Sequence, residues 1–208
     1  MLNFLRLHWF DLGIIFLVPI GIYLYIYNQS QISFLLWISL ITLFIHQFEE
    51  YRYPGYFPGM MNIAMFKSEI PDRYPLNTNT ALIVNTIVGW LFYFLAAVFS
   101  ESLIWLGIAT ILVSFGNFMV HTFIFNIKGK TKYNPGMATA MVLFLPLTVY
   151  FFYLVITNNL ALPLDWLVGI ILGIILNIVG VLGIIYWLKD ENTTFIFPKR
   201  SLIPSMRK

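Results

Sequence analysis

Six long apolar runs constrain this chain more than any other feature of its sequence. They cover residues 9–27, 32–51, 80–99, 102–127, 136–156 and 164–188. Each is close to or above the roughly 20 residues that a helix needs to cross a hydrocarbon core. Charged residues make up 10% of the chain, against about 25% in soluble domains. The sequence therefore predicts an all-α, polytopic membrane bundle of six transmembrane helices, with residues 1–208 as one integral membrane domain.

The 12 basic residues predict the orientation of this bundle. They precede the first run, lie in the loops after the second and fourth runs, or follow the sixth. They are Arg6, Arg52, Lys67, Arg73, Lys128, Lys130, Lys132, Lys189, Lys199, Arg200, Arg207 and Lys208. Because cytoplasmic loops carry an excess of Lys and Arg, both termini are expected in the cytoplasm. Topology thus explains the net charge of +3, and no nucleic-acid partner is expected.

The long loop at 52–79 contains the apolar stretch "PGYFPGMMNIAMF". Its Met and Phe content predicts a short helix that lies in the membrane interface on the cytoplasmic side. This helix either caps the bundle or forms a lid at a substrate entrance. The chain has no cysteine, so any metal site must use histidine nitrogen, carboxylate or amide oxygen, and water.

Polar side chains gather near the cytoplasmic ends of the second and fourth runs. His46 is three residues from Glu49 and four from Glu50, so the three share one face of a helix. Asn117 and His121 repeat the four-residue spacing on another run. Helical bundles build metal sites from such inward faces on neighbouring helices. Ionisable residues at membrane depth are functional candidates by default.

Further polar residues are expected at the same depth. Asn85 lies within two turns of the cytoplasmic end of the third run, and Tyr133 and Asn134 lie in the loop after the fourth. His8 and Asp11 begin the first run. All three histidines of the chain are therefore expected on one side of the membrane.

Structural readings of the same residues remain open at this point. Glu49 and Glu50 could be the first solvated residues after a span, paired with Arg52. His46 or His121 alone could be a core histidine bonded to a backbone carbonyl. The asparagines could join helices through hydrogen bonds.

The segment "HQFEE" at 46–50, the following Pro-Gly region, the later His121 and "YNPGMATA" at 133–140 resemble the HXXEE family. That family consists of small bacterial membrane proteins whose activity is uncharacterised. The resemblance implies a multi-helix protein of the bacterial inner membrane with an enzymatic activity. It supplies no substrate.

The leading functional hypothesis is a metal-dependent enzyme at the cytoplasmic membrane edge. His46, His121 and Glu50 (or Glu49) are expected to bind zinc or iron, with His8 as a further candidate ligand. The carboxylate left free would act as general base on metal-bound water, whose pKa falls to about 7 in such sites.

The remaining polar residues are assigned to the substrate. Asn85 and Tyr133 are expected to position it or to stabilise an oxyanion, and Asn117 and Asn134 to assist in positioning. Since the site opens beside hydrocarbon, the expected substrate is a lipid or another amphiphile, which would be hydrolysed or oxidised.

Three alternatives stay open. A metal-free isomerase or cyclase could use the adjacent carboxylates as acid and base. A proton- or cation-coupled carrier could use them as a relay, although no acidic residue lies near the predicted midplane. The chain could also be a subunit of another membrane protein. The sequence carries no signal for an oligomeric state.

Overall fold

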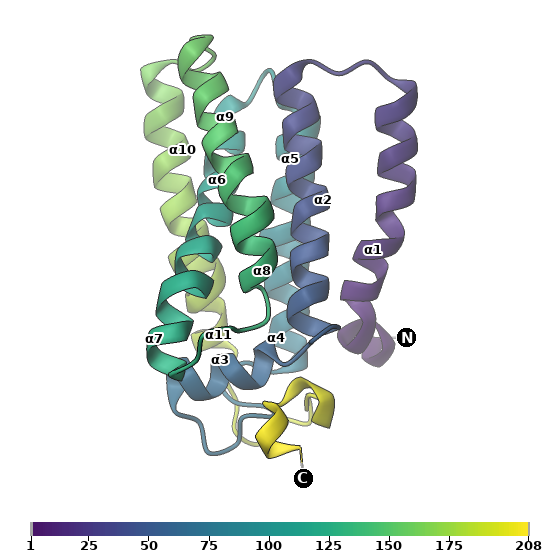
Figure 1. Ribbon diagram of the computed structural model, residues 1–208, viewed down its shortest axis with the longest axis vertical. Helices are drawn as coiled ribbons and strands as arrows, with labels where there is room; N and C mark the ends of the chain where they lie inside the picture. The colour runs from purple at the N-terminus through teal and green to yellow at the C-terminus, as the bar shows by residue number, and fades with distance from the viewer. Residues whose placement is uncertain (1, 208) are drawn as a thin grey trace.

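The computed structural model describes residues 2–207, so the basic residue Lys208 lies outside the described residues. Six of its helices are long and apolar enough to cross a membrane, and residues 2–207 contain no strand. The helices are Leu2–Ile26, Gln31–Tyr51, Thr78–Val98, Ile104–Gly129, Met137–Thr157 and Pro163–Trp187. The predicted all-helical bundle of six spans is confirmed (Figure 1). The first helix begins earlier than predicted, because its polar N-terminal turn is also helical.

The first two spans, α1 (Leu2–Ile26) and α2 (Gln31–Tyr51), are continuous α-helices, whereas each of the other four contains a π-helical stretch. The flanking α-helices are α4 (Thr78–Ile83) and α5 (Phe92–Val98), α6 (Ile104–Met119) and α7 (Phe125–Gly129), α8 (Met137–Thr139) and α9 (Leu145–Thr157), and α10 (Pro163–Ile175) and α11 (Ile184–Trp187). The π-helical stretches are Val84–Leu91, Val120–Ile124, Ala140–Phe144 and Leu176–Gly183. Such stretches are rare and often occur at functional sites.

The second span is the most buried helix of the bundle. In its most apolar stretch 67% of the residues are buried, against 17% for α1. Leu36, Leu40 and Phe44 on α2 belong to one core cluster with Phe144 and Phe151 of the fifth span. Figure 1 shows α2 inside the bundle and α1 at its edge. The "HQFEE" segment is therefore carried by the end of a buried helix.

A ten-residue helix, α3 (Phe57–Phe66), lies in the loop between the second and third spans. Asn62 holds the rest of this loop against α3. Its amide nitrogen donates to the carbonyls of Pro71 and Leu76, and its oxygen accepts from the Leu76 N–H, each at 2.9 Å. The location of α3 in a membrane interface stays a prediction.

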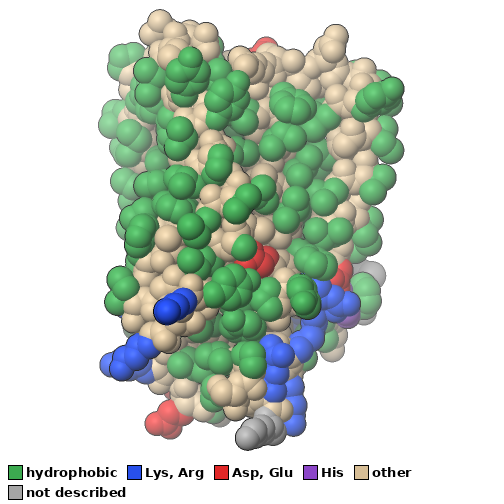
Figure 2. Space-filling model, in the orientation of Figure 1, with side chains coloured by type: hydrophobic (Ala, Val, Ile, Leu, Met, Phe, Trp, Pro, Cys, Tyr) green, Lys and Arg blue, Asp and Glu red, His purple; other side chains and the backbone are tan. Residues whose placement is uncertain are grey.

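The charged side chains are unevenly distributed. On the face shown in Figure 2, Lys and Arg gather at the lower end, while the body above is largely apolar. Figure 1 places both ends of the described chain at that lower end, together with α3.

Two glycines allow α6 and α10 to pack closely. A Cβ added to Gly169 would lie 2.7 Å from the Cβ of Ile108 and 2.8 Å from the carbonyl oxygen of Trp105. One added to Gly173 would lie 2.9 Å from the Cβ of Leu112. Small residues at such contacts let helix backbones approach in membranes, where the hydrophobic effect does not drive helix association.

We expect Gly169→Ala to destabilise the detergent-solubilised protein by about 1–3 kcal/mol, because the new methyl group meets backbone that cannot yield. The measurement is the thermal unfolding midpoint. Gly183→Ala is the matched control in the same span, since its nearest contacts lie at 3.5 Å or more. Equal midpoints for the two variants would show that α6 and α10 do not depend on this contact.

Candidate metal centre

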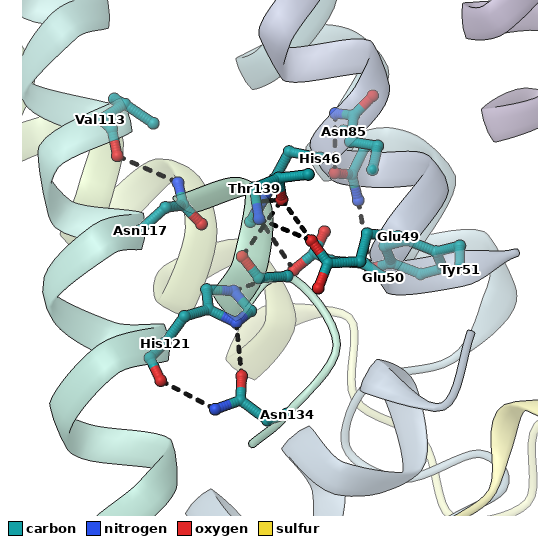
Figure 3. A network of polar contacts seen from close by, with 12 residues as sticks. His46, Glu49, Glu50, Tyr51, Asn85, Val113, Asn117, His121, Asn134 and Thr139 are labelled. Carbon is teal, nitrogen blue, oxygen red and sulfur yellow. Dashed lines mark hydrogen bonds and ion pairs between the residues drawn. The ribbon is translucent and has the colours of Figure 1, made fainter. Parts of the chain in front are cut away.

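Three ionisable side chains meet inside the lower half of the bundle. His46 and Glu50 come from α2, and His121 comes from the π-helical stretch Val120–Ile124. Glu50 Oε1 lies 3.1 Å from His121 Nε2 and 3.6 Å from His46 Nε2. One ligand atom from each residue lies within 4.8 Å of the others, and all three residues are buried. Figure 3 shows the three side chains pointing toward one another.

His121 is oriented by Asn134. The Asn134 amide nitrogen donates to the His121 carbonyl at 2.8 Å and to Asn126 Oδ1 at 2.9 Å. The amide oxygen must then face His121 Nδ1, which lies 2.7 Å away. Because an amide oxygen only accepts, Nδ1 carries a proton, and in the neutral imidazole Nε2 therefore presents its lone pair to Glu50.

His46 is oriented in the same sense by Thr139. His46 Nδ1 lies 2.8 Å from the Thr139 hydroxyl, which also contacts Glu49 Oε2. An ionised carboxylate only accepts, so the hydroxyl donates to Glu49 and accepts from His46 Nδ1. His46 Nε2 therefore also presents a lone pair toward Glu50. This nitrogen is buried and has no hydrogen-bond partner among the described residues.

With both imidazoles neutral, three acceptor atoms face one another in a buried space. Such an arrangement is unfavourable unless a proton or a cation lies between them. In a tetrahedral zinc site, metal–ligand distances of 2.0–2.2 Å place the ligand atoms about 3.4 Å apart. The two separations that involve Glu50, 3.1 and 3.6 Å, lie on either side of this value, and the whole set of ligand atoms lies within 4.8 Å. The two imidazoles and one carboxylate thus fit a divalent metal ion.

Glu49 has a different environment from Glu50. Its Oε1 accepts from the Tyr133 hydroxyl at 2.8 Å and from the Ala138 N–H at 3.2 Å. Its Oε2 accepts from the Thr139 N–H at 2.8 Å and from the Thr139 hydroxyl. An anion is stabilised at a helix N-terminus by the free N–H groups there. Glu49 thus caps the fifth span.

Tyr133 contributes a neutral donor to this cap. Burial, followed by its hydrogen bond to the Glu49 carboxylate, raises the pKa of the Tyr133 phenol above its ordinary value. The phenol therefore stays protonated at neutral pH and keeps donating to Glu49.

Gly136 lies against both histidines. Its φ of +98° lies in the region that favours glycine. A Cβ there would lie 2.8 Å from His121 Nδ1 and 2.9 Å from His46 Cε1. The turn at Asn134–Gly136 thus brings the loop close to both rings.

A cavity of about 80 Å³ adjoins the cluster. His46 and Glu50 line one part of it, and most of the rest is apolar. The other polar side chains of its wall are Gln47, Tyr51, Asn85, Tyr93 and Asn117. A space of this size holds a few water molecules or one small polar group.

The family described as "Protein of unknown function with HXXEE motif" matches residues 37–151, more than half of the chain. The chain belongs to the HXXEE family. The resemblance predicted from the sequence is thereby confirmed. No curated protein and no solved structure matches the chain. The region shared with the HXXEE family contains the three converging side chains, the cap and the glycine turn, so the whole cluster lies within it.

The structure brings together most of the residues singled out in the HXXEE sequence. Asn85 and Asn117 line the cavity beside the cluster. Tyr133 and Asn134 instead contact Glu49 and His121. His8 lies apart, where its Nδ1 is 2.9 Å from Asp11 and its side chain is 35% exposed.

The solvated-pair reading of the two HXXEE carboxylates is wrong. Glu49 and Glu50 are 8% and 5% exposed, and the nearby Arg52 contacts Asp11 at 3.4 Å instead. Sequence reasoning also missed Gly136 and Thr139. Both lie in the "YNPGMATA" segment that supported the family resemblance, but no local pattern gave either residue a role.

We expect Gly136→Ala to destabilise the protein by about 1–3 kcal/mol, because the added methyl group strains a positive φ and meets two fixed imidazoles. The thermal unfolding midpoint is the measurement. Gly129→Ala is the control, since the nearest atom there is the flexible end of Met60. A Gly136→Ala midpoint equal to that of wild type would contradict the close approach of the loop to the histidines.

Proposed function

We propose that this HXXEE protein is a metal-dependent membrane enzyme that hydrolyses or oxidises a lipid or another amphiphile. The observation that carries this proposal is the convergence of His46 Nε2, His121 Nε2 and a Glu50 oxygen, each histidine held through its other ring nitrogen. Two histidines and one carboxylate leave coordination positions open for water or substrate. This pattern is typical of catalytic zinc sites and of non-haem iron sites.

The roles of the side chains follow from their contacts. His46, His121 and Glu50 would hold the metal ion, which supplies a bound water that ionises near neutral pH. Asn134 and Thr139 orient the two imidazoles, as partners of metal ligands commonly do. Glu49 already accepts four hydrogen bonds. We therefore assign Glu49 to positioning, because it is not available as the general base expected from the sequence.

Two features support an amphiphilic substrate. The cavity of about 80 Å³ admits a reacting group but not a whole lipid. An apolar groove of about 460 Å³ lies between α1, α2 and the third span, lined among others by Phe44 and Trp90. The Trp90 indole N–H donates to Gln47 Oε1 at 2.7 Å, and Gln47 lines the cavity. The groove and the cavity that holds the polar cluster are therefore connected through the contact between Trp90 and Gln47.

A second candidate is metal-free acid–base catalysis on a lipidic substrate. The 3.1 Å contact between His121 Nε2 and Glu50 Oε1 favours it, because a shared proton would also relieve the facing acceptors. Metal analysis separates the two candidates.

The metal proposal predicts about one zinc or iron per chain in protein purified without chelators. His46→Ala, His121→Ala and Glu50→Gln should each lower that content below about one tenth, since each removes a ligand. Thr139→Val should weaken metal affinity by about 10- to 100-fold, because it leaves His46 Nδ1 without an acceptor. The measurements are elemental analysis and metal titration.

His8→Ala is the matched control for these variants, because His8 lies outside the cluster. It should retain the wild-type metal content. A content far below one per chain in wild type, or one that His46→Ala leaves unchanged, would favour the metal-free candidate.

We also propose that the protein resides in the bacterial inner membrane with both termini in the cytoplasm. The position of the basic residues supports this orientation. They gather at the end of the molecule that holds both termini and α3 (Figures 1 and 2).

The orientation can be tested with single-cysteine variants, since the chain has no cysteine of its own. Asn28→Cys and Leu160→Cys should react with a membrane-impermeant maleimide in intact cells. Glu69→Cys should react only after the membrane is opened. The reverse pattern would overturn the proposed orientation.

A further inference from the structure

A chain of hydrogen bonds runs along the cavity wall. The Trp90 indole N–H donates to Gln47 Oε1 at 2.7 Å, and Gln47 Nε2 donates to Asn85 Oδ1 at 3.0 Å. Asn85 Nδ2 then donates to the Ala81 carbonyl at 2.8 Å and to the Tyr51 hydroxyl at 3.3 Å. Three elements therefore contribute to one connected network: α2, α4 and the π-helical stretch Val84–Leu91.

The two groups at the ends of this network determine which atom donates in every hydrogen bond. An indole N–H can only donate, so the Gln47 oxygen faces Trp90 and its nitrogen faces Asn85. A backbone carbonyl can only accept, so the Asn85 nitrogen faces Ala81. Both ends give the same orientation of the two amides. The Tyr51 oxygen consequently accepts from Asn85.

In this arrangement the Tyr51 hydroxyl proton has no acceptor within the network. Among the described residues, the bond from Asn85 is the one hydrogen bond that reaches this hydroxyl. Tyr51 is 4% exposed and lines the cavity together with His46 and Glu50. A buried donor without an acceptor is costly, and such groups usually meet a ligand or water.

The Tyr51 ring is held in place by aromatic neighbours. Its centroid lies 4.8 Å from that of Trp9, 5.9 Å from that of Phe10 and 5.8 Å from that of Phe57. The hydroxyl therefore stays at the cavity instead of turning toward another partner. A donor held this way before the ligand arrives needs little reorganisation when it binds.

We propose that Tyr51 is a substrate-binding residue whose O–H donates to a carbonyl or carboxylate oxygen in the cavity that His46 and Glu50 also line. The reacting group would then be an ester, an amide or a carboxylic acid. This inference rests on the proposed function and names the chemical class of its substrate. The cavity volume of about 80 Å³ limits the bound part to such a small group. Asn85 acts through Tyr51, because both of its amide hydrogens already have acceptors.

The test uses acetohydroxamate, a small carbonyl-containing probe, and the full-length protein in detergent, with zinc added and after chelation. Calorimetric titration gives the dissociation constant. Tyr51→Phe should raise it by about 3- to 10-fold, the range expected for one hydrogen bond to an uncharged carbonyl oxygen. Tyr93→Phe is the matched control, because Tyr93 lines the same cavity but its hydroxyl is paired with Ser114 at 2.7 Å. Its dissociation constant should stay within about twofold of wild type.

The outcomes separate this inference from the proposed function. Equal binding by wild type and Tyr51→Phe overturns the inference even if the metal is present. A lack of probe binding to wild type, both with zinc added and after chelation, overturns it as well. Binding that depends on Tyr51 in a protein that never takes up metal supports the inference and overturns the metal proposal.

A measurement on wild type guards against a misfolded variant. The infrared carbonyl band of isotope-labelled probe bound to the chelated protein should lie below that of the probe in an apolar solvent. An unshifted band would overturn the role of Tyr51.

Discussion

The carboxylate of Glu49 connects the two parts of the molecule on which the site depends. It accepts hydrogen bonds from the free N–H groups at the start of the fifth span and from the Thr139 hydroxyl. The same hydroxyl accepts a hydrogen bond from His46 Nδ1. A buried anion is stable only where donors surround it, and this helix N-terminus supplies them. The contact of Glu49 with Thr139 therefore joins α2 to the fifth span and also fixes the tautomer of His46.

Helical geometry explains why two adjacent carboxylates serve two purposes. At 100° per residue, Glu49 lies about 60° to one side of His46 and Glu50 about 40° to the other. The two carboxylates must then meet different neighbours, even though they follow each other in the chain. Glu49 meets the fifth span, while Glu50 meets His121. A single carboxylate could not both cap a helix and join two imidazoles.

The sequence was sufficient to predict the spans and a meeting of His46 and His121 with one of the two carboxylates, because span length, topology and helical spacing place these residues at one depth. It could not separate the roles of Glu49 and Glu50, since both fit one broad helical face. Contacts such as that of Gly136 with both histidines depend on how a loop meets two spans, and no local pattern encodes this. The π-helical stretches were missed for a similar reason: Val120–Ile124 reads as ordinary helix, yet it carries His121.

Charge compensation is what distinguishes the two halves of the site. Glu49 receives four hydrogen bonds from its surroundings, whereas Glu50 Oε1 lies against the Nε2 atoms of His46 and His121, which present lone pairs when the imidazoles are neutral. An ionised Glu50 therefore needs a positive charge between itself and the histidines. A divalent ion would meet that need beside the cavity that Tyr51 also lines. A carbonyl oxygen in contact with both the ion and the Tyr51 hydroxyl would be polarised by each of them.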